Sequence, residues 1–138
     1  MSGQEGKEQI IARIRDVFAS LPSIRVGYIY GSFLSRNDFR DIDIALLVDE
    51  HTSGDDPLTY ASRVADVLGA ALGFSHECDA RVINHEPVWF QYEVIRSGRA
   101  VYVRDENGRL DFETRVLIEY QDLKFMYDLF DREYLAQV

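Results

Sequence analysis

Two aspartates at the start of an apolar segment are the residues of this sequence best placed to do chemistry. Asp41 and Asp43 open the run DIDIALLV at residues 41–48. On a β-strand, side chains two residues apart project from the same face, with Cα atoms ~6.5–7 Å apart. Two carboxylates held so close repel each other unless a cation lies between them. Mg²⁺ suits this position, because it prefers oxygen ligands and is usually held by one or two carboxylates plus substrate phosphates.

A glycine and a serine precede the aspartates at the end of another β-type segment. Gly31 lets the backbone approach a ligand closely, and Ser32 can begin a short helix whose free N–H groups face an anion. A triphosphate could rest there, with the Ser32 hydroxyl donating to it, while Arg36 and Arg40 in the following loop also reach phosphate. With one or two metal ions, such a site suits phosphoryl or nucleotidyl transfer. The plainer alternative is that the acidic pair marks a solvated strand edge.

The elements that must position these residues follow from periodicity and from turn residues. Apolar residues at helical spacing predict helices, β-branched and aromatic runs predict strands, and Asn107-Gly108 predicts a turn before a helix capped by Asp111. The helices are expected over 7–19, 58–72, 87–97 and 111–135, with a short one after Gly31, and the strands over 24–30, 41–48, 77–84 and 100–103. We therefore predict one α/β (α+β) domain over residues 1–138, with a mixed sheet covered by helices and a long C-terminal helix.

Composition narrows the classes of protein. The net charge is −9, and residues 1–48 hold six acidic and six basic side chains, so the excess lies in residues 49–138. Phosphate-backbone binding needs a basic patch, so we expect no direct nucleic-acid partner. No apolar run reaches the ~20 residues of a membrane span. A single cysteine, Cys78, fits a reducing compartment, and we expect a cytoplasmic protein. The three histidines lack zinc-site spacing.

The segment GSFLSRNDFRDIDIALLV resembles the Gly-Ser…Asp-x-Asp signature of the DNA polymerase β-like nucleotidyltransferase superfamily. Within it, the whole chain is most similar to the small minimal nucleotidyltransferase (MNT) proteins. The resemblance implies a polymerase β-like nucleotidyltransferase core, with Gly31 and Ser32 binding the nucleotide and with Asp41 and Asp43 holding Mg²⁺.

The resemblance also implies a third carboxylate on a following strand, which binds the metal and orients or deprotonates the attacking hydroxyl. Asp79 is the best match, and Glu77 on the same face is the alternative. Asp79 could instead form a surface pair with Arg81. One departure concerns the residue before the first aspartate, which is often small or hydroxylated in the family and is Arg40 here. That arginine could bind phosphate or could neutralise Asp41.

The implied activity is transfer of a nucleoside monophosphate, most simply AMP from ATP, to an acceptor hydroxyl. MNT proteins are similar to antitoxins of HEPN-domain ribonuclease toxins, some of which are silenced by adenylylation of a tyrosine. We therefore expect a Mg²⁺-dependent nucleotidyltransferase that acts on a protein partner, a HEPN-type toxin. Two alternatives stay open: an antitoxin that neutralises its partner by binding alone, and a small-molecule nucleotidyltransferase of the aminoglycoside-modifying kind.

The C-terminal helix predicts a partner interface independently of the resemblance. One apolar stripe repeats at 4, 4, 3, 4, 3 and 4 residues, and it comprises Phe112, Val116, Tyr120, Leu123, Tyr127, Phe130 and Tyr134. A second stripe of Ile118, Phe125, Met126 and Leu129 points elsewhere. A sheet covers one side of a helix, so the rest would be exposed without another chain. The nearby acids, Glu113, Glu119, Asp122, Asp128 and Asp131, favour a basic partner. The alternative is that both stripes pack within the domain, against Trp89 and Tyr92.

Overall fold

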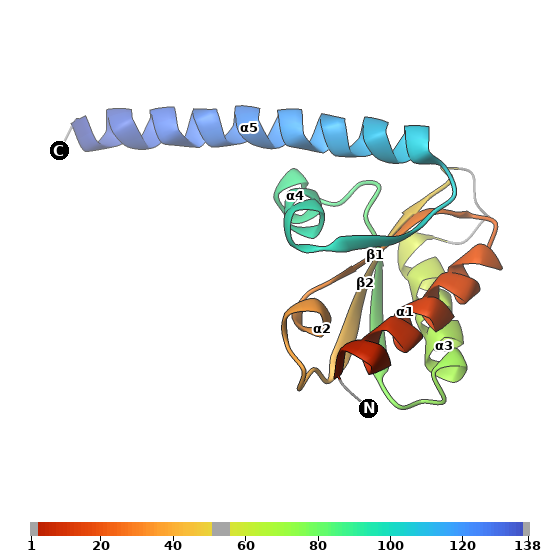
Figure 1. The fold of residues 1–138 in the computed structure, drawn as a ribbon. Helices are drawn as coiled ribbons and strands as arrows, with labels where there is room; N and C mark the ends of the chain where they lie inside the picture. Colours follow the sequence, from red (N-terminus) through yellow and green to blue (C-terminus); the bar gives the residue numbers. More distant parts are fainter. Residues whose placement is uncertain (1–2, 51–55, 137–138) are drawn as a thin grey trace.

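The chain forms a four-stranded mixed sheet covered by helices on both faces (Figure 1). The computed structural model describes residues 3–50 and 56–136. The helices are α1 (Gly3–Ala19), α2 (Ser32–Ser35), α3 (Pro57–Ala71), α4 (Val88–Ser97) and α5 (Glu106–Ala136), and the strands are β1 (Ile24–Tyr30), β2 (Asp41–Val48), β3 (Glu77–Val82) and β4 (Arg99–Val103). The predicted fold class and element order are confirmed.

The strand order is β3-β2-β1-β4, which makes β2 an inner strand and β3 an edge strand. β1 pairs antiparallel with both β2 and β4, whereas β2 and β3 run parallel. The parallel pair follows from α3, which carries the chain back to the starting end of the sheet. Because β2 is covered on both faces, every residue from Ile44 to Val48 is buried.

Two hydrophobic clusters hold the helices to the two faces. On one face, Phe18 of α1 and Leu68 of α3 pack with Ile44 of β2. On the other, Val94 of α4 and Phe112 of α5 belong to the cluster around the inner strands. Alternation along β2 assigns Asp41 and Asp43 to the α4–α5 face, and their neighbours Ile42 and Ile44 to the α1–α3 face. The start of β2 thus presents carboxylates on one face while the same segment is anchored in the core by the other.

The C-terminal helix begins earlier than the sequence predicts. α5 starts at Glu106, not at residue 111, and Asn107-Gly108 lies in its first turn, so the predicted turn and the Asp111 cap are wrong. Asp105 is the N-terminal cap: its Oδ1 accepts a hydrogen bond from the Gly108 N–H at 2.9 Å, and its Oδ2 accepts one from Arg25 Nη2 at 2.6 Å. Glycine fits in that turn because a Cβ there would overlap the same Arg25 and Asp105 side chains.

The third strand ends earlier than predicted, at Val82. Asn84, which the sequence placed in the strand, is buried and uses its side-chain amide to bridge the end of β2. Its Oδ1 accepts from the Val48 N–H at 3.0 Å, and its Nδ2 donates to the Val48 carbonyl at 2.7 Å.

Within the described residues, no helix has both the length and the hydrophobicity that a membrane crossing requires.

Candidate active site

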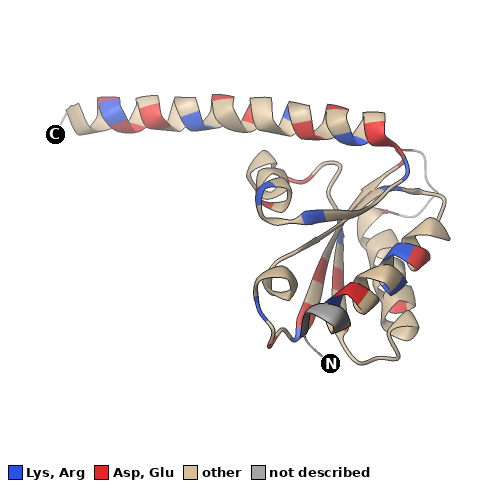
Figure 2. Ribbon diagram, in the orientation of Figure 1, with Lys and Arg blue, Asp and Glu red and all other residues tan. Residues whose placement is uncertain are grey.

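Asp43 is flanked on both sides by polar side chains of neighbouring strands. In the sheet register its partner on β3 is Asp79, and its partner on β1 is Tyr30. Paired residues on adjacent strands lie about 5 Å apart. Asp41 is paired with Glu77, two residues nearer the start of both strands. The register therefore brings the predicted carboxylates together, and Figure 2 shows acidic segments on the neighbouring strands of the sheet.

The charges in this group are not balanced. Asp43 is half-buried, and that burial raises its pKa. The carboxylates of Asp79 and Asp41 raise the pKa of Asp43 further, and Arg81 opposes them. Asp41 and Asp79 themselves are exposed. A negative charge on Asp43 is thus disfavoured in the protein alone, and a bound cation would relieve it.

Gly31 lies directly against this carboxylate. Its backbone has φ 79° and ψ −154°, a conformation that is essentially restricted to glycine. A Cβ at this position would overlap Oδ2 of Asp43 and would lie 3.3 Å from its Cγ. Ser32 then begins α2, a single turn in which the Arg36 N–H donates to the Ser32 carbonyl at 2.9 Å. The Gly31-Ser32 corner and the acidic pair therefore form one contiguous surface.

The two predicted phosphate-binding arginines have different surroundings. Arg36 forms a two-point pair with Asp38, at 2.9 and 2.8 Å, and is exposed. Such a solvent-exposed pair is weak, so a phosphate could compete for the guanidinium. Arg40 is exposed and lines a groove together with Asp41 and Asp79. Within the described residues, no ion pair joins Arg40 to Asp41.

Three residues around the carboxylates were not predicted as part of the site. Arg81 does not pair with Asp79 among the described residues, and its guanidinium carbon lies 5.0 Å from the centre of the Phe90 ring. Phe90 of α4 in turn packs edge-on against Tyr30, with ring centroids 5.8 Å apart. Burial and the Asp43 charge raise the pKa of Tyr30 to about 12. The sequence signals were weak: Tyr30 directly precedes Gly31, and Arg81 shares a strand face with Asp79.

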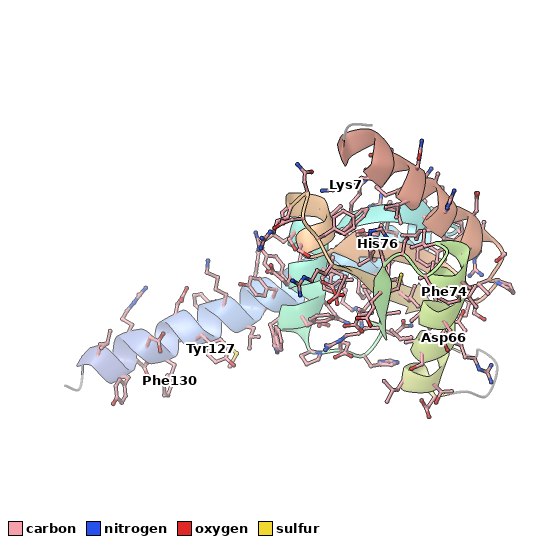
Figure 3. All side chains as sticks on the ribbon, turned by 90° about the horizontal axis from the view of Figure 1, so that it is seen from below. Lys7, Asp66, Phe74, His76, Tyr127 and Phe130 are labelled. Atoms are coloured by element: carbon pink, nitrogen blue, oxygen red, sulfur yellow. The ribbon has the colours of Figure 1, made fainter. Side chains whose placement is uncertain are left out.

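A groove runs beside the edge strand β3, next to the carboxylates. It is lined by Arg40, Asp41, Ala65, Asp66, Gly69, Phe74, Ser75, His76, Glu77, Cys78 and Asp79. Phe74 is 80% exposed and has φ 59°, an uncommon value for a bulky residue. His76 stacks on Phe39 with centroids 5.0 Å apart. Figure 3 shows Asp66, Phe74 and His76 gathered on one side of the body.

The donor set fits a hard divalent cation chemically. Asp41, Asp43 and Asp79 supply only carboxylate oxygens, which Mg²⁺ prefers, and burial together with the neighbouring Asp79 and Asp41 charges raises the pKa of Asp43. Across residues 3–50 and 56–136, however, no three histidine, cysteine or acidic side chains are grouped closely enough to form a metal site as they stand. A cation held here would therefore take ligands from the substrate as well, which is usual for Mg²⁺ bound with nucleotide phosphates.

Residues 12–107 match the model of the family described as polymerase beta, nucleotidyltransferase. The match covers more than half of the chain and includes the Gly31-Ser32 corner and all three aspartates. The chain belongs to the polymerase beta nucleotidyltransferase family. The family predicted from the Gly-Ser and Asp-x-Asp segment is thus confirmed. No curated protein matches the sequence.

Solved structures of toxin–antitoxin complexes have the same fold. A chain of a toxin–antitoxin crystal structure with AMP-PNP is 19% identical, with TM-score 0.68, and the alignment covers 91% of this nucleotidyltransferase and 98% of that chain. A chain of the MntA–HepT toxin–antitoxin structure is 20% identical, with TM-score 0.61 and coverage of 96% and 98%. A chain of the tri-AMPylated Shewanella oneidensis HEPN toxin in complex with MNT antitoxin is 19% identical, with TM-score 0.62 and coverage of 97% and 99%. These similarities establish the fold.

Proposed function

We propose that this nucleotidyltransferase transfers AMP from ATP to a hydroxyl of a partner protein, and that it is the antitoxin of a HEPN-type toxin. The observation that carries the proposal is the pairing of Asp43 with Asp79 across β2 and β3, with Asp41 two residues along the strand. The nucleotide and the partner are suggested by the similar structures, which contain AMP-PNP and an AMPylated HEPN toxin.

Each residue of the site has a distinct role in this reaction. Gly31 and Ser32 would hold the triphosphate, with the Ser32 hydroxyl donating to a phosphate oxygen. Asp41, Asp43 and Asp79 would hold Mg²⁺, which supplies charge neutralisation at the attacking and leaving oxygens when it is bound. Arg40 and Arg36 would contact the outer phosphates.

The bond changes follow from this arrangement. The acceptor oxygen forms a bond to the α-phosphorus, the bond from that phosphorus to the β-phosphate oxygen breaks, and pyrophosphate leaves. Asp79 would receive the acceptor proton, a role supported by its position on the strand furthest from the Gly31-Ser32 corner.

The acceptor would approach from the side of β3. Gly31 directly follows β1, and Asp43 and Asp79 lie on the successive strands β2 and β3. The donor would therefore occupy the inner side of the carboxylates and the acceptor the edge side. The groove beside β3 opens there, and its acidic lining residues outnumber the basic ones. That charge favours a cationic acceptor segment, and the exposed ring of Phe74 offers it an aromatic contact.

The experiment is incubation with ATP labelled at the α-phosphate, Mg²⁺ and the protein encoded by the neighbouring gene. We expect label on the partner, loss of transfer in Asp41→Asn and Asp43→Asn, and retained transfer in Asp16→Asn, a variant of an exposed acid on α1 that lies outside the groove. No transfer under any of these conditions would refute the catalytic proposal.

A second candidate function is neutralisation by binding alone. It is favoured by the lack of a preassembled three-ligand metal site among the described residues, and by the exposed apolar surface of α5. The same experiment separates the two functions. A partner that is inhibited but carries no label identifies the binding-only antitoxin.

A further inference from the structure

The first half of α5 is attached to the body of the protein. Phe112 and Val116 are buried against the sheet face that α4 also covers. The ring of Tyr120 stacks on Tyr92 of α4, with centroids 3.6 Å apart and planes 4° apart. The alternative that both apolar stripes pack within the domain holds only for Phe112, Val116 and Tyr120 of the first stripe, because Ile118 of the second stripe is 58% exposed.

Beyond Leu123 the helix leaves the body, and every residue from Lys124 to Ala136 is exposed (Figures 1 and 3). Seven of these residues are large and apolar: Phe125, Met126, Tyr127, Leu129, Phe130, Tyr134 and Leu135, with exposed fractions between 43% and 70%. Tyr127, Phe130 and Tyr134 among them continue the first apolar stripe, and we call these three the distal face. Apolar groups gathered so densely on about 20 Å of helix are typical of a surface that another protein covers.

The spacing within the distal half indicates the shape of the occupant. Tyr120, Leu123, Tyr127, Phe130 and Tyr134 are separated by 3, 4, 3 and 4 residues, the seam of a helix that packs along another helix. The seam continues the buried stripe of Phe112 and Val116 on the same side of α5. An occupying helix would thus lie on the side of α5 that faces the body, beyond α4.

The acidic residues beside the seam favour a basic partner helix over a second copy of this chain. Residues 117–136 carry five acidic and two basic side chains, and Figure 2 shows acidic bands along the helix. A second copy of this chain would bring the same acidic excess, and the whole chain has a net charge of −9. A basic helix would instead place lysine or arginine opposite Asp131 and Glu133, which lie next to the seam.

We propose that the distal face of α5 is the docking surface for an apolar helix of a positively charged partner protein. The choice of partner rests on the function proposed above, but the surface acts through binding and needs no transfer. Substitutions on it should leave Mg²⁺-nucleotide binding unchanged, because its residues lie in the part of α5 where every residue is exposed and belong to neither hydrophobic cluster.

The test measures binding of the full chain to the protein encoded by the neighbouring gene, which is the HEPN-type partner in the function proposed above. Binding is followed by titration calorimetry in the Asp43→Asn background, so that no transfer contributes. We expect Tyr127→Ser with Phe130→Ser to weaken binding by about 100-fold or more, as loss of two central aromatic contacts does. Leu58→Ser is the matched control, since Leu58 is 77% exposed on α3, and it should bind within about twofold of the parent.

Two further readouts complete the test. The double variant should keep the melting temperature of the parent, because both side chains are more than 60% exposed. Hydrogen exchange in the complex should be slowed in residues 117–136. Unchanged binding by the double variant would overturn the proposal. So would a dimer of the chain alone that the same substitutions dissociate, because the occupant would then be a second copy.

Discussion

Gly31 and Asp43 lie so close together that no side chain fits between them. The backbone of Gly31 passes the Asp43 carboxylate in a conformation with φ 79°, and a Cβ would overlap Oδ2. The end of β1 and the start of β2 are therefore coupled through one glycine. In the proposed function this contact joins the triphosphate corner to the metal carboxylates.

The first prediction concerns that contact. Gly31→Ala adds the overlap with Asp43 to a backbone strain of about 1–3 kcal/mol, so we expect the free energy of unfolding to fall by about 3 kcal/mol or more. Gly73→Ala is the matched control. Gly73 also has positive φ, at 67°, but a Cβ there meets nothing within 4 Å, so the loss should be about 1–2 kcal/mol. Urea unfolding measures both, and equal losses would show that the contact with Asp43 is unimportant.

Asp43→Asn should separate function from stability. The substitution removes a half-buried charge that Asp79 and Asp41 repel, so the melting temperature without metal should stay unchanged or rise by up to about 3 °C. Loss of a residue that only hydrogen-bonds to a metal ligand lowers metal affinity by about 10–100-fold. Asp43 is proposed to bind the metal directly, so the fall in Mg²⁺-nucleotide affinity should be larger than that. Differential scanning calorimetry and titration calorimetry provide the two values. A marked fall in melting temperature without metal would identify Asp43 as structural.

Phe74→Gly tests the groove. Glycine adopts positive φ without strain, so we expect stability to be unchanged or to rise by up to about 1 kcal/mol. If the exposed ring contacts the acceptor, KM for the protein acceptor should rise about tenfold, with nucleotide affinity unchanged. Steady-state kinetics with labelled ATP measures both effects. An unaltered KM for the acceptor would remove Phe74 from the acceptor site.

The cap of α5 should make stability depend on pH. Hydrogen bonds from Arg25 and from the Gly108 N–H lower the pKa of Asp105 below its usual range. The ionised carboxylate thus stabilises the fold above the ordinary aspartate pKa of about 3.9, and this contribution is lost as the pH falls through the lowered value. Asp105→Asn keeps a capping oxygen without the charge.

We therefore expect wild type to exceed Asp105→Asn in stability at pH 7, and the difference to disappear as the pH falls through the lowered pKa of Asp105. Chemical unfolding at a series of pH values follows this difference. A difference that is independent of pH would mean that the charge on Asp105 contributes nothing.

Local sequence patterns predicted the elements wherever one signal dominated. β1 and β2 have the predicted bounds, because β-branched and aromatic residues there coincide with burial. The start of α5 was mispredicted for a tertiary reason. Asn107-Gly108 is a turn signal by itself, but the distant Arg25 orients Asp105 to cap a helix through those residues. The role of Asn84 at the end of β2 likewise depends on a contact between segments far apart in sequence.

The sequence predicted the acidic residues of the candidate site, but it did not predict all the side chains that surround them. Asp41 and Asp43 share a face by strand alternation, and the register then adds Asp79 beside Asp43. The contribution of Phe90 and Arg81 depends on how α4 packs on the sheet, which no local pattern encodes. The pairing of Arg36 with Asp38 was also missed, although the two lie only two residues apart.

Binding of Mn²⁺ tests the central claim most directly, because its paramagnetic signal reports occupancy without any need for turnover. The protein is titrated with Mn²⁺ in the presence of a non-hydrolysable ATP analogue, and free Mn²⁺ is followed by electron paramagnetic resonance. We predict nucleotide-dependent uptake that Asp43→Asn and Asp79→Asn abolish and that Asp66→Asn leaves intact. Absence of uptake, or uptake that persists in both of the first two variants, would contradict a cation site between β2 and β3.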